Sequence, residues 1–445
     1  MSPELSADFR VRLKQEMALW VGEGIINEQT AGILNARYQL DDIKKESSRL
    51  LAAVIFTVGG LLLGGGLISF VAANWEQIPT AVKVTLLLSL MLAFYGAGYW
   101  LWQEKGMPRL GHALVFTGCL VFGANIGLMA QIFNISGDWY GGFGAWALGA
   151  LVMAWAAQSW ITGALALAAS SLWFVGYSHD HPQSWVAMMP LVIIALVLPL
   201  AWRIGSRALY ALCFVALTFM LCNLTTLPGG TSQLMPATMA VGGFLAWTAG
   251  EFHRARRIRP AFGPPIAAIG MLTLAGCAYI WSFHWWWNEG NWFIGSRRES
   301  LPFLWAAPVI ITALVALALA ALVLRDANID ASRRLLMIGV VAASLILILC
   351  AVNGARGIGD QVISTVGVNL AALVIALVAI GVGLMDERRL AFWAGSLYLV
   401  VLILSRFLEY ETSLLLKSAA FTACGLAMIA AGLAFEKRLN RKEAM

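Results

Sequence analysis

Apolar stretches of about twenty residues, separated by short polar turns, cover the chain from Leu50 almost to its end. A helix rises about 1.5 Å per residue, so about 20 apolar residues cross a hydrocarbon core of about 30 Å. The pattern therefore predicts an all-α, polytopic transmembrane helix bundle. Its spans number about fourteen and lie at residues 50–72, 80–102, 110–133, 141–157, 160–178, 185–202, 207–223, 235–250, 262–283, 303–324, 335–352, 362–384, 390–409 and 414–434.

The fourth and fifth spans are divided by two polar residues alone, Gln158 and Ser159. Positive charge supports the division. If both termini face the cytoplasm, the inner segments carry 24 of the 30 Lys and Arg residues, and the outer connections carry three. Cytoplasmic loops are enriched in Lys and Arg, and merging the two spans would move most of the later positive charges outside. We therefore predict fourteen spans with both ends inside.

The first 49 residues have a different pattern. Apolar residues recur every four positions from Leu5 to Met17, which predicts an amphipathic helix. Gly24 interrupts this helix, and Asn27 is placed to cap a second one. Such a hairpin either folds onto its own membrane domain or binds a cytoplasmic protein partner. The expected domains are a cytoplasmic helical hairpin at 1–49, a transmembrane helical domain at 50–435 and a basic cytoplasmic tail at 436–445.

Composition places most of this chain in lipid. Hydrophobic residues make up 60% of it and charged residues only 12%, whereas soluble domains carry about 25% charged residues. The net charge is +6, and the positively charged residues flank the apolar stretches. We therefore expect anionic membrane lipids as the partner, and not nucleic acid. The six cysteines all lie inside apolar stretches, which disfavours a disulfide framework or a zinc site. The expected location is the bacterial inner membrane; the oligomeric state is left open.

Two stretches resemble a known family. Gly59 to Lys83 reads GGLLLGGGLISFVAANWEQIPTAVK, and Gly123 to Trp146 reads GANIGLMAQIFNISGDWYGGFGAW. Together with the short helical N-terminus, they resemble the bacterial domain-of-unknown-function 2157 family of predicted multi-pass membrane proteins. The resemblance covers roughly residues 10–160. It implies a membrane location and no particular activity.

Polar side chains at membrane depth are costly and are therefore candidates for a pathway. These side chains form two groups, whose members are given at the end of this paragraph. The first group would converge on an outward-facing pocket, with Gln131 and Asn134 sharing a helix face. The alternative is that the amides of this group form hydrogen bonds with neighbouring helices. The second group would form a charged outer vestibule with Arg406 and Glu409 paired on one face, or its cations reach the headgroups. The first group is Asn74, Glu76, Asn125, Gln131, Asn134 and Asp138, and the second is Arg406, Glu409, Lys417 and Lys83.

Two further clusters have ordinary explanations. His179, Asp180 and His181 are metal-ligand types, but adjacent residues rarely point at one ion, so we expect a solvated loop. Residues 284–302 hold four tryptophans, which are typical of an interfacial belt; the alternative is a stacking platform for a sugar or a lipid headgroup. The sequence has no GxxxxGK[ST], HExxH or GxSxG motif. We therefore assign no catalytic, cofactor-binding or metal-binding residue.

Three hypotheses for function remain. The first is a transporter or flippase-like carrier of a small or amphiphilic solute, based on the number of spans, the glycine content and the polar residues at depth. The second is a non-transporting sensor or scaffold that uses the N-terminal hairpin. The third is a membrane enzyme acting on lipid-linked sugars, for which Asp138, Glu289 and Glu299 are the outer carboxylates close to aromatic residues.

Overall fold

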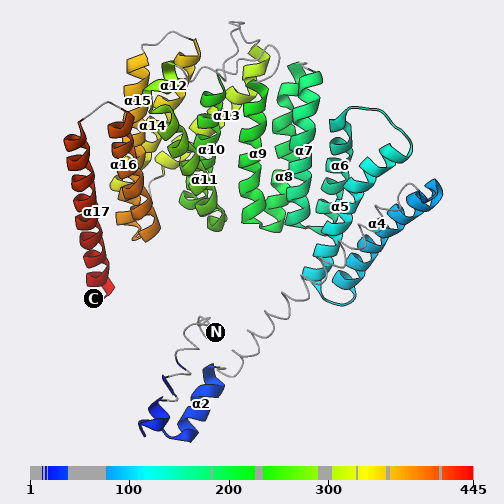
Figure 1. Cartoon of the computed structure of the whole chain (residues 1–445), viewed down its shortest axis with the longest axis horizontal. Coiled ribbons are helices and arrows are strands. Elements are labelled where there is room, and N and C mark those ends of the chain that lie inside the picture. The colour runs from blue at the N-terminus through cyan, green and yellow to red at the C-terminus, as the bar shows by residue number, and fades with distance from the viewer. Residues whose placement is uncertain are drawn as a thin grey trace. The chain divides into compact units, whose positions relative to one another are not determined.

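A computed structural model describes most of the chain (Figure 1). The described residues are 13, 16, 17, 19–38, 77–181, 184–225, 234–288, 303–326, 329–356, 361–409 and 413–443. Within them the secondary structure is helical throughout, which confirms the all-α class. The expected first span, 50–72, lies outside the described residues.

The long helices follow the predicted spans closely, with ends that differ by a few residues, except that α17 continues to Glu443, into the segment predicted as the basic tail. Short 3₁₀ turns precede α8 at Ser184–Met188 (η2) and α11 at Pro260–Phe262 (η4). The helices are α2 Glu28–Tyr38, α4 Thr80–Gln103, α5 Pro108–Ile132, α6 Trp139–Ala157, α7 Trp160–Asp180, α8 Met189–Ile204, α9 Arg207–Thr225, α10 Met235–Ala255, α11 Gly263–Trp281, α12 His284–Asn288, α13 Phe303–Leu324, α14 Ala331–Arg356, α15 Gln361–Met385, α16 Arg389–Glu409 and α17 Leu414–Glu443.

Twelve helices in the described part of the chain are long and apolar enough to cross a membrane. Each of them coincides with one of the predicted spans. The span predicted at 235–250 also forms a helix, α10, but α10 is not among the twelve. A polytopic helical bundle is therefore confirmed, while the count of fourteen spans and the orientation of the termini remain predictions.

The division between the fourth and fifth spans is confirmed at the predicted residues. Gln158 follows the end of α6 and takes a left-handed conformation, with φ 48° and ψ 42°. Ser159 then caps α7, because its hydroxyl accepts a hydrogen bond from the Thr162 amide at 3.4 Å. The chain reverses within these two residues, and α6 and α7 pack against each other along their lengths.

The chain divides into two compact units, residues 1–85 and 86–445. In the first unit, the expected helix cap is present: the Thr30 amide donates to Asn27 Oδ1 at 2.7 Å at the start of α2. Gly24, just before it, has a φ of 71°, which favours glycine and fits the predicted interruption.

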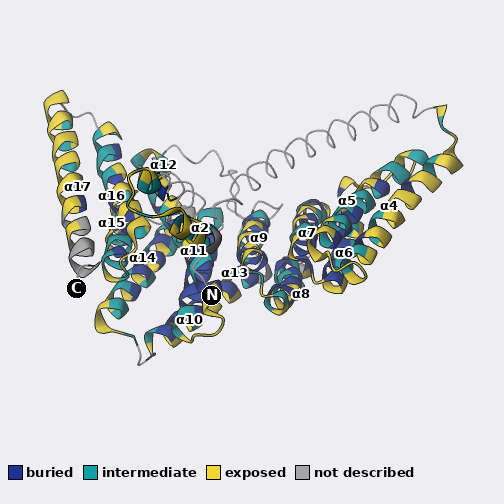
Figure 2. Ribbon diagram, turned by 90° about the horizontal axis from the view of Figure 1, so that it is seen from below, coloured by how far each residue is buried: buried dark blue, intermediate teal, exposed yellow. Residues whose placement is uncertain are grey.

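Helix α10 lies at the centre of the second unit. It contacts α9, α11, α13 and α14, and 15 of its 21 residues are buried, whereas α4 and α17 expose most of theirs (Figure 2). Gly250 and Gly270 bring α10 and α11 close together, since a methyl group on Gly250 would lie 2.5 Å from the Ala267 amide nitrogen. Helix α10 is therefore enclosed by its neighbouring helices.

Candidate functional site

An apolar cavity of about 530 Å³ lies between α8, α9, α10 and α13. Ligand pockets typically span about 300–1,000 Å³, so this one is large enough for a small ligand or part of an acyl chain. Leu217, Leu245 and Leu319 are among its aliphatic walls, and Cys213 contributes a buried thiol. Its lining residues are Ile194, Leu198, Trp202, Tyr210, Cys213, Phe214, Leu217, Leu245, Ala249, Phe252, His253, Ile258, Val315 and Leu319.

Three rings from different helices line one end of this cavity, and a fourth ring, Phe262, packs against them. Trp202 comes from the last turn of α8, Tyr210 from the first turn of α9 and His253 from the last turn of α10, and Phe262 comes from η4. The centroids of Tyr210 and Phe262 lie 4.9 Å apart, and those of Trp202 and His253 lie 5.7 Å apart. All four residues therefore sit where their helices end, so the aromatic cluster marks one end of the cavity.

His253 supplies the polar group of this cluster and is 4% exposed. Its Nδ1 lies 2.6 Å from the Ile258 carbonyl oxygen, and its Nε2 lies 3.1 Å from the Tyr210 hydroxyl. A carbonyl only accepts, so Nδ1 carries the hydrogen; in the neutral ring Nε2 then accepts from the Tyr210 hydroxyl. Both ring nitrogens are satisfied, which makes a buried histidine tolerable and fixes the ring against the cavity wall.

Arg259 adds a positive charge next to the aromatic cluster. Its guanidinium lies 4.9 Å from the centroid of the Trp202 ring and also donates to the Trp202 carbonyl. The backbone at Arg259 is left-handed, with a φ of 47°, which is uncommon for a residue other than glycine. The cavity thus has an apolar body and an end with a histidine, a tyrosine hydroxyl and a guanidinium nearby. That arrangement suits a molecule with one apolar and one polar end.

The structure describes four members of the first predicted polar group: Asn125, Gln131, Asn134 and Asp138. Asn125 is buried on α5, and its Nδ2 donates to the Leu87 carbonyl of α4 at 3.1 Å, which is the helix-to-helix bond of the alternative hypothesis. The shared helix face of Gln131 and Asn134 is wrong, because α5 ends at Ile132 and Asn134 has a φ of 49°. Both side chains are exposed, as is Asp138, which accepts a 2.9 Å hydrogen bond from the Tyr140 hydroxyl.

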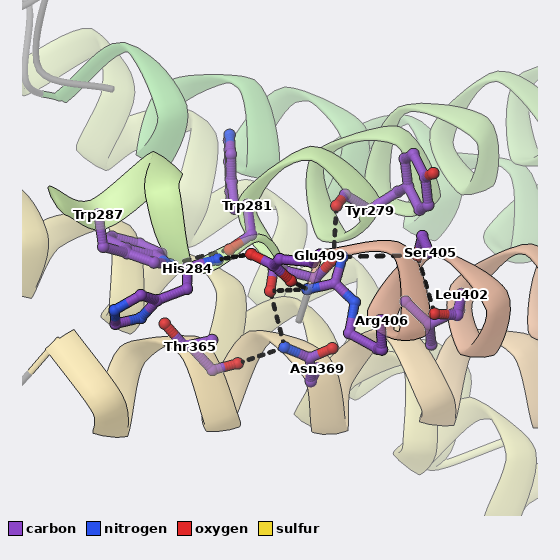
Figure 3. Close-up of polar contacts among 11 residues, drawn as sticks. Tyr279, Trp281, His284, Trp287, Thr365, Asn369, Leu402, Ser405, Arg406 and Glu409 are labelled. Carbon is purple, nitrogen blue, oxygen red and sulfur yellow. Dashed lines mark hydrogen bonds and ion pairs between the residues drawn. The ribbon is translucent and has the colours of Figure 1, made fainter. Parts of the chain in front are cut away.

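The predicted pairing of Arg406 and Glu409 is confirmed. Arg406 Nη1 lies 2.5 Å from Glu409 Oε2 (Figure 3). The same nitrogen donates to the Ser282 carbonyl at 2.6 Å. Glu409 Oε1 accepts from the His284 amide at 2.5 Å, and Asn369 donates to the same Ser282 carbonyl at 2.9 Å. These contacts join α16 and α15 to the chain between α11 and α12. The observed partners are mainly backbone groups at helix ends.

The remaining residues of the predicted pathway are less informative. Lys83, on α4, and Lys417, on α17, are both half-buried. Asn74 and Glu76 lie outside the described residues. The described contacts therefore show an Arg406–Glu409 pair but do not test whether any of the ten residues lines a pathway.

The histidine and tryptophan clusters are held by local contacts. His179 Nδ1 lies 2.7 Å from the Val175 carbonyl of its own helix, and the His181 ring stacks on Tyr177 with centroids 4.4 Å apart. Trp287 Nε1 donates to the Trp281 carbonyl at 2.8 Å, so this indole is turned toward its own segment. Glu289, Trp292 and Glu299 lie outside the described residues. Among the described residues, no three metal-ligand side chains come together.

The cavity is the site that the sequence analysis missed. Its residues are drawn from α8, α9, α10 and α13, and only tertiary packing brings them together. One signal was available: His253 follows closely on the predicted span 235–250, and ionisable residues at membrane depth are costly enough to be site candidates.

Comparison with known proteins gives one match. No curated protein and no solved structure matches the chain. The family model described as "Predicted membrane protein (DUF2157)" matches residues 18–162. The match ends before α8 begins, so the cavity lies outside the matched segment. The match confirms the resemblance inferred from the Asn-Trp and glycine-rich stretches: residues 18–162 of this chain are similar to the DUF2157 family of predicted membrane proteins.

Proposed function

We propose that this protein is a carrier of an amphiphilic solute in the bacterial inner membrane, and that the cavity between α8, α9, α10 and α13 holds the apolar part of that solute. The observation behind the proposal is the cavity itself: about 530 Å³ with aliphatic walls and polar groups gathered near one end. A wholly polar solute would find few hydrogen-bond partners along these walls, and its desolvation would be uncompensated.

The positive-inside rule gives the proposal a direction. If both termini are cytoplasmic, α8 and α10 end on the cytoplasmic side, where Arg203, Arg254 and Arg257 lie. The aromatic cluster then lies at the cytoplasmic end of the cavity, at the depth where tryptophan and tyrosine rings concentrate. A solute would place its polar end near His253 and Arg259 and its apolar end toward the bilayer midplane.

The test uses the full-length chain in vesicles with a fluorescent, NBD-labelled phosphatidylglycerol. Dithionite bleaches only the outer leaflet, so a carrier of amphiphiles raises the bleached fraction above that of protein-free vesicles. Leu319→Trp adds bulk at a half-buried cavity position, and Leu322→Trp makes the same change at an exposed position of α13 outside the cavity lining.

We expect Leu319→Trp to reduce the rate of bleaching of the inner leaflet at least tenfold, and Leu322→Trp to leave it within twofold of the parent. A parent protein that bleaches no more lipid than empty vesicles would remove the carrier proposal for this class of amphiphile. Equal rates for the two variants would show that the cavity is not on the path.

A further inference from the structure

A second cavity, of about 630 Å³, lies where α10 ends and α14 begins, beside the turn between α15 and α16. Its lining is basic, unlike that of the apolar cavity. Arg254, Arg257, Arg333 and Arg388 contribute four guanidinium groups, and Asp386 contributes a carboxylate. The other lining residues are Pro260 and Pro264.

Two carboxylates hold three of these arginines in place. Glu251 Oε1 lies 2.5 Å from Arg254 Nη1, and Glu251 Oε2 lies 3.8 Å from Arg333 Nη2. Asp386 lies 3.7 Å from Arg333 and 3.9 Å from Arg388. Four guanidinium groups against two carboxylates leave two positive charges uncompensated. Because Glu251 is only 6% exposed, part of this network is well shielded from solvent, where screening is weaker.

Some hydrogen-bond donors of these arginines have no partner among the described residues. Arg254 Nε is buried and has no hydrogen-bond partner in the described part of the chain. The Arg257 guanidinium, which also lines a neighbouring cavity of about 650 Å³, makes no ion pair or hydrogen bond with any described residue. A buried donor without a partner is costly, so a bound acceptor would stabilise this site.

The turns that border the cavity are conformationally unusual. Arg257 and Glu387 have φ values of 53° and 56°, in the left-handed region that residues other than glycine seldom adopt. Arg257 lies in the turn after α10, and Glu387 lies between Asp386 and Arg388. Such conformations are energetically unfavourable and tend to cluster at binding sites.

We infer that this arginine cavity binds a phosphate-type oxyanion. Guanidinium groups match phosphate oxygens bidentately, and basic pockets between transmembrane helices bind anionic headgroups. The phosphate belongs either to an anionic lipid of the bilayer or to a free phosphate in solution. The site is distinct from the apolar cavity, and the inference does not depend on the proposed carrier function.

The variant that tests this is Arg257→Gln with Arg388→Gln. Neither change removes the last partner of a buried carboxylate, because Asp386 keeps Arg333 and Glu251 keeps Arg254. The matched control is Arg203→Gln with Arg207→Gln. These two exposed arginines lie around the α8–α9 turn and line neither the arginine cavity nor the neighbouring cavity of about 650 Å³. Both double variants lose the same charge.

Native mass spectrometry of the purified full-length chain measures binding of phosphatidylglycerol and of phosphatidylcholine, and a second arm adds inorganic phosphate as a competitor. We expect tighter binding of phosphatidylglycerol than of phosphatidylcholine, a loss of at least tenfold in that affinity in the cavity variant, and a change within twofold in the control. Displacement of the lipid by millimolar phosphate identifies a site for free phosphate; lipid that stays bound identifies a headgroup site.

Either outcome of the competition supports an oxyanion site. Equal binding of the two lipids, together with no displacement of either lipid by inorganic phosphate, would overturn the inference. So would equal losses of phosphatidylglycerol affinity in the two double variants, because the effect would then come from general charge rather than from this cavity.

Discussion

Glu409 Oε2 lies 2.5 Å from Arg406 Nη1, and the other oxygen of the same carboxylate accepts from the backbone amide of His284, 125 residues earlier in the chain. The pair therefore does more than neutralise charge on α16. It satisfies backbone groups where α11 stops and α12 starts, at a point where helix ends leave donors and acceptors without intrahelical partners. The side chains are 19% and 10% exposed, so the pair is largely shielded.

Breaking this pair should destabilise the bundle. We expect Arg406→Gln to lower the free energy of unfolding by about 3–5 kcal/mol, because it leaves the Glu409 carboxylate and the Ser282 carbonyl without their cationic donor. Thermal unfolding in detergent, followed by tryptophan fluorescence, measures the effect. Lys417→Gln, on α17, is the control and should change the midpoint little. An unchanged midpoint for Arg406→Gln would mean that the network contributes nothing to stability.

The contact between α10 and α11 predicts a difference between two glycines on one helix. Gly270→Ala places a methyl group against the backbone of Trp247 and within 2.6 Å of the Gly243 carbonyl oxygen, so we expect a loss of about 1–3 kcal/mol in stability. Gly276→Ala, on the same helix, meets no atom within 4 Å and should be neutral or slightly stabilising. The comparison is again the unfolding midpoint. Equal midpoints for the two variants would argue against the close packing of α10 on α11.

The orientation of the helices gives a third prediction. Green fluorescent protein fused after Ile258 should fluoresce, and alkaline phosphatase fused at the same position should be inactive. The reason is that the arginine-rich turn after α10 is expected in the cytoplasm. Fusions after Asn288 should show the reverse. Activity of alkaline phosphatase at Ile258 would invert the proposed topology.

Deletion of the predicted N-terminal hairpin distinguishes the carrier hypothesis from the scaffold hypothesis. We expect deletion of residues 1–45 to leave lipid translocation by the membrane domain within twofold of the parent, provided that equal amounts of protein reach the vesicles. The hairpin has its own capped helix, α2, so its loss need not disturb the helices of the other compact unit. Loss of translocation at equal protein levels would show that the hairpin takes part in the carrier cycle.

Local sequence signals were enough to predict most of the helices. The break between α6 and α7 was readable at Gln158 and Ser159, because a left-handed residue and a serine cap need only a few neighbouring residues. The Arg406–Glu409 pair was readable for the same reason, since the two residues are three apart on one helix.

Features that depend on tertiary packing were not predictable. The sequence gives no register between α8 and α13, so the cavity lined by Leu198 and Leu319 could not be foreseen. The four arginines of the second cavity were interpreted as markers of topology, because their convergence requires α10, α14 and the turn before α16 to meet. The shared face of Gln131 and Asn134 was wrong because Asn134 lies beyond the end of α5, as it also lies beyond the predicted span 110–133.

An electron cryo-microscopy map of the full-length chain in lipid nanodiscs tests the central claim most directly. The account predicts elongated density between α8, α9, α10 and α13, with one end near Trp202 and His253, and its disappearance in Leu319→Trp but not in Leu322→Trp. A cavity closed by contact between α8 and α13, or one that stays empty at a resolution where annular lipids are visible, would contradict it.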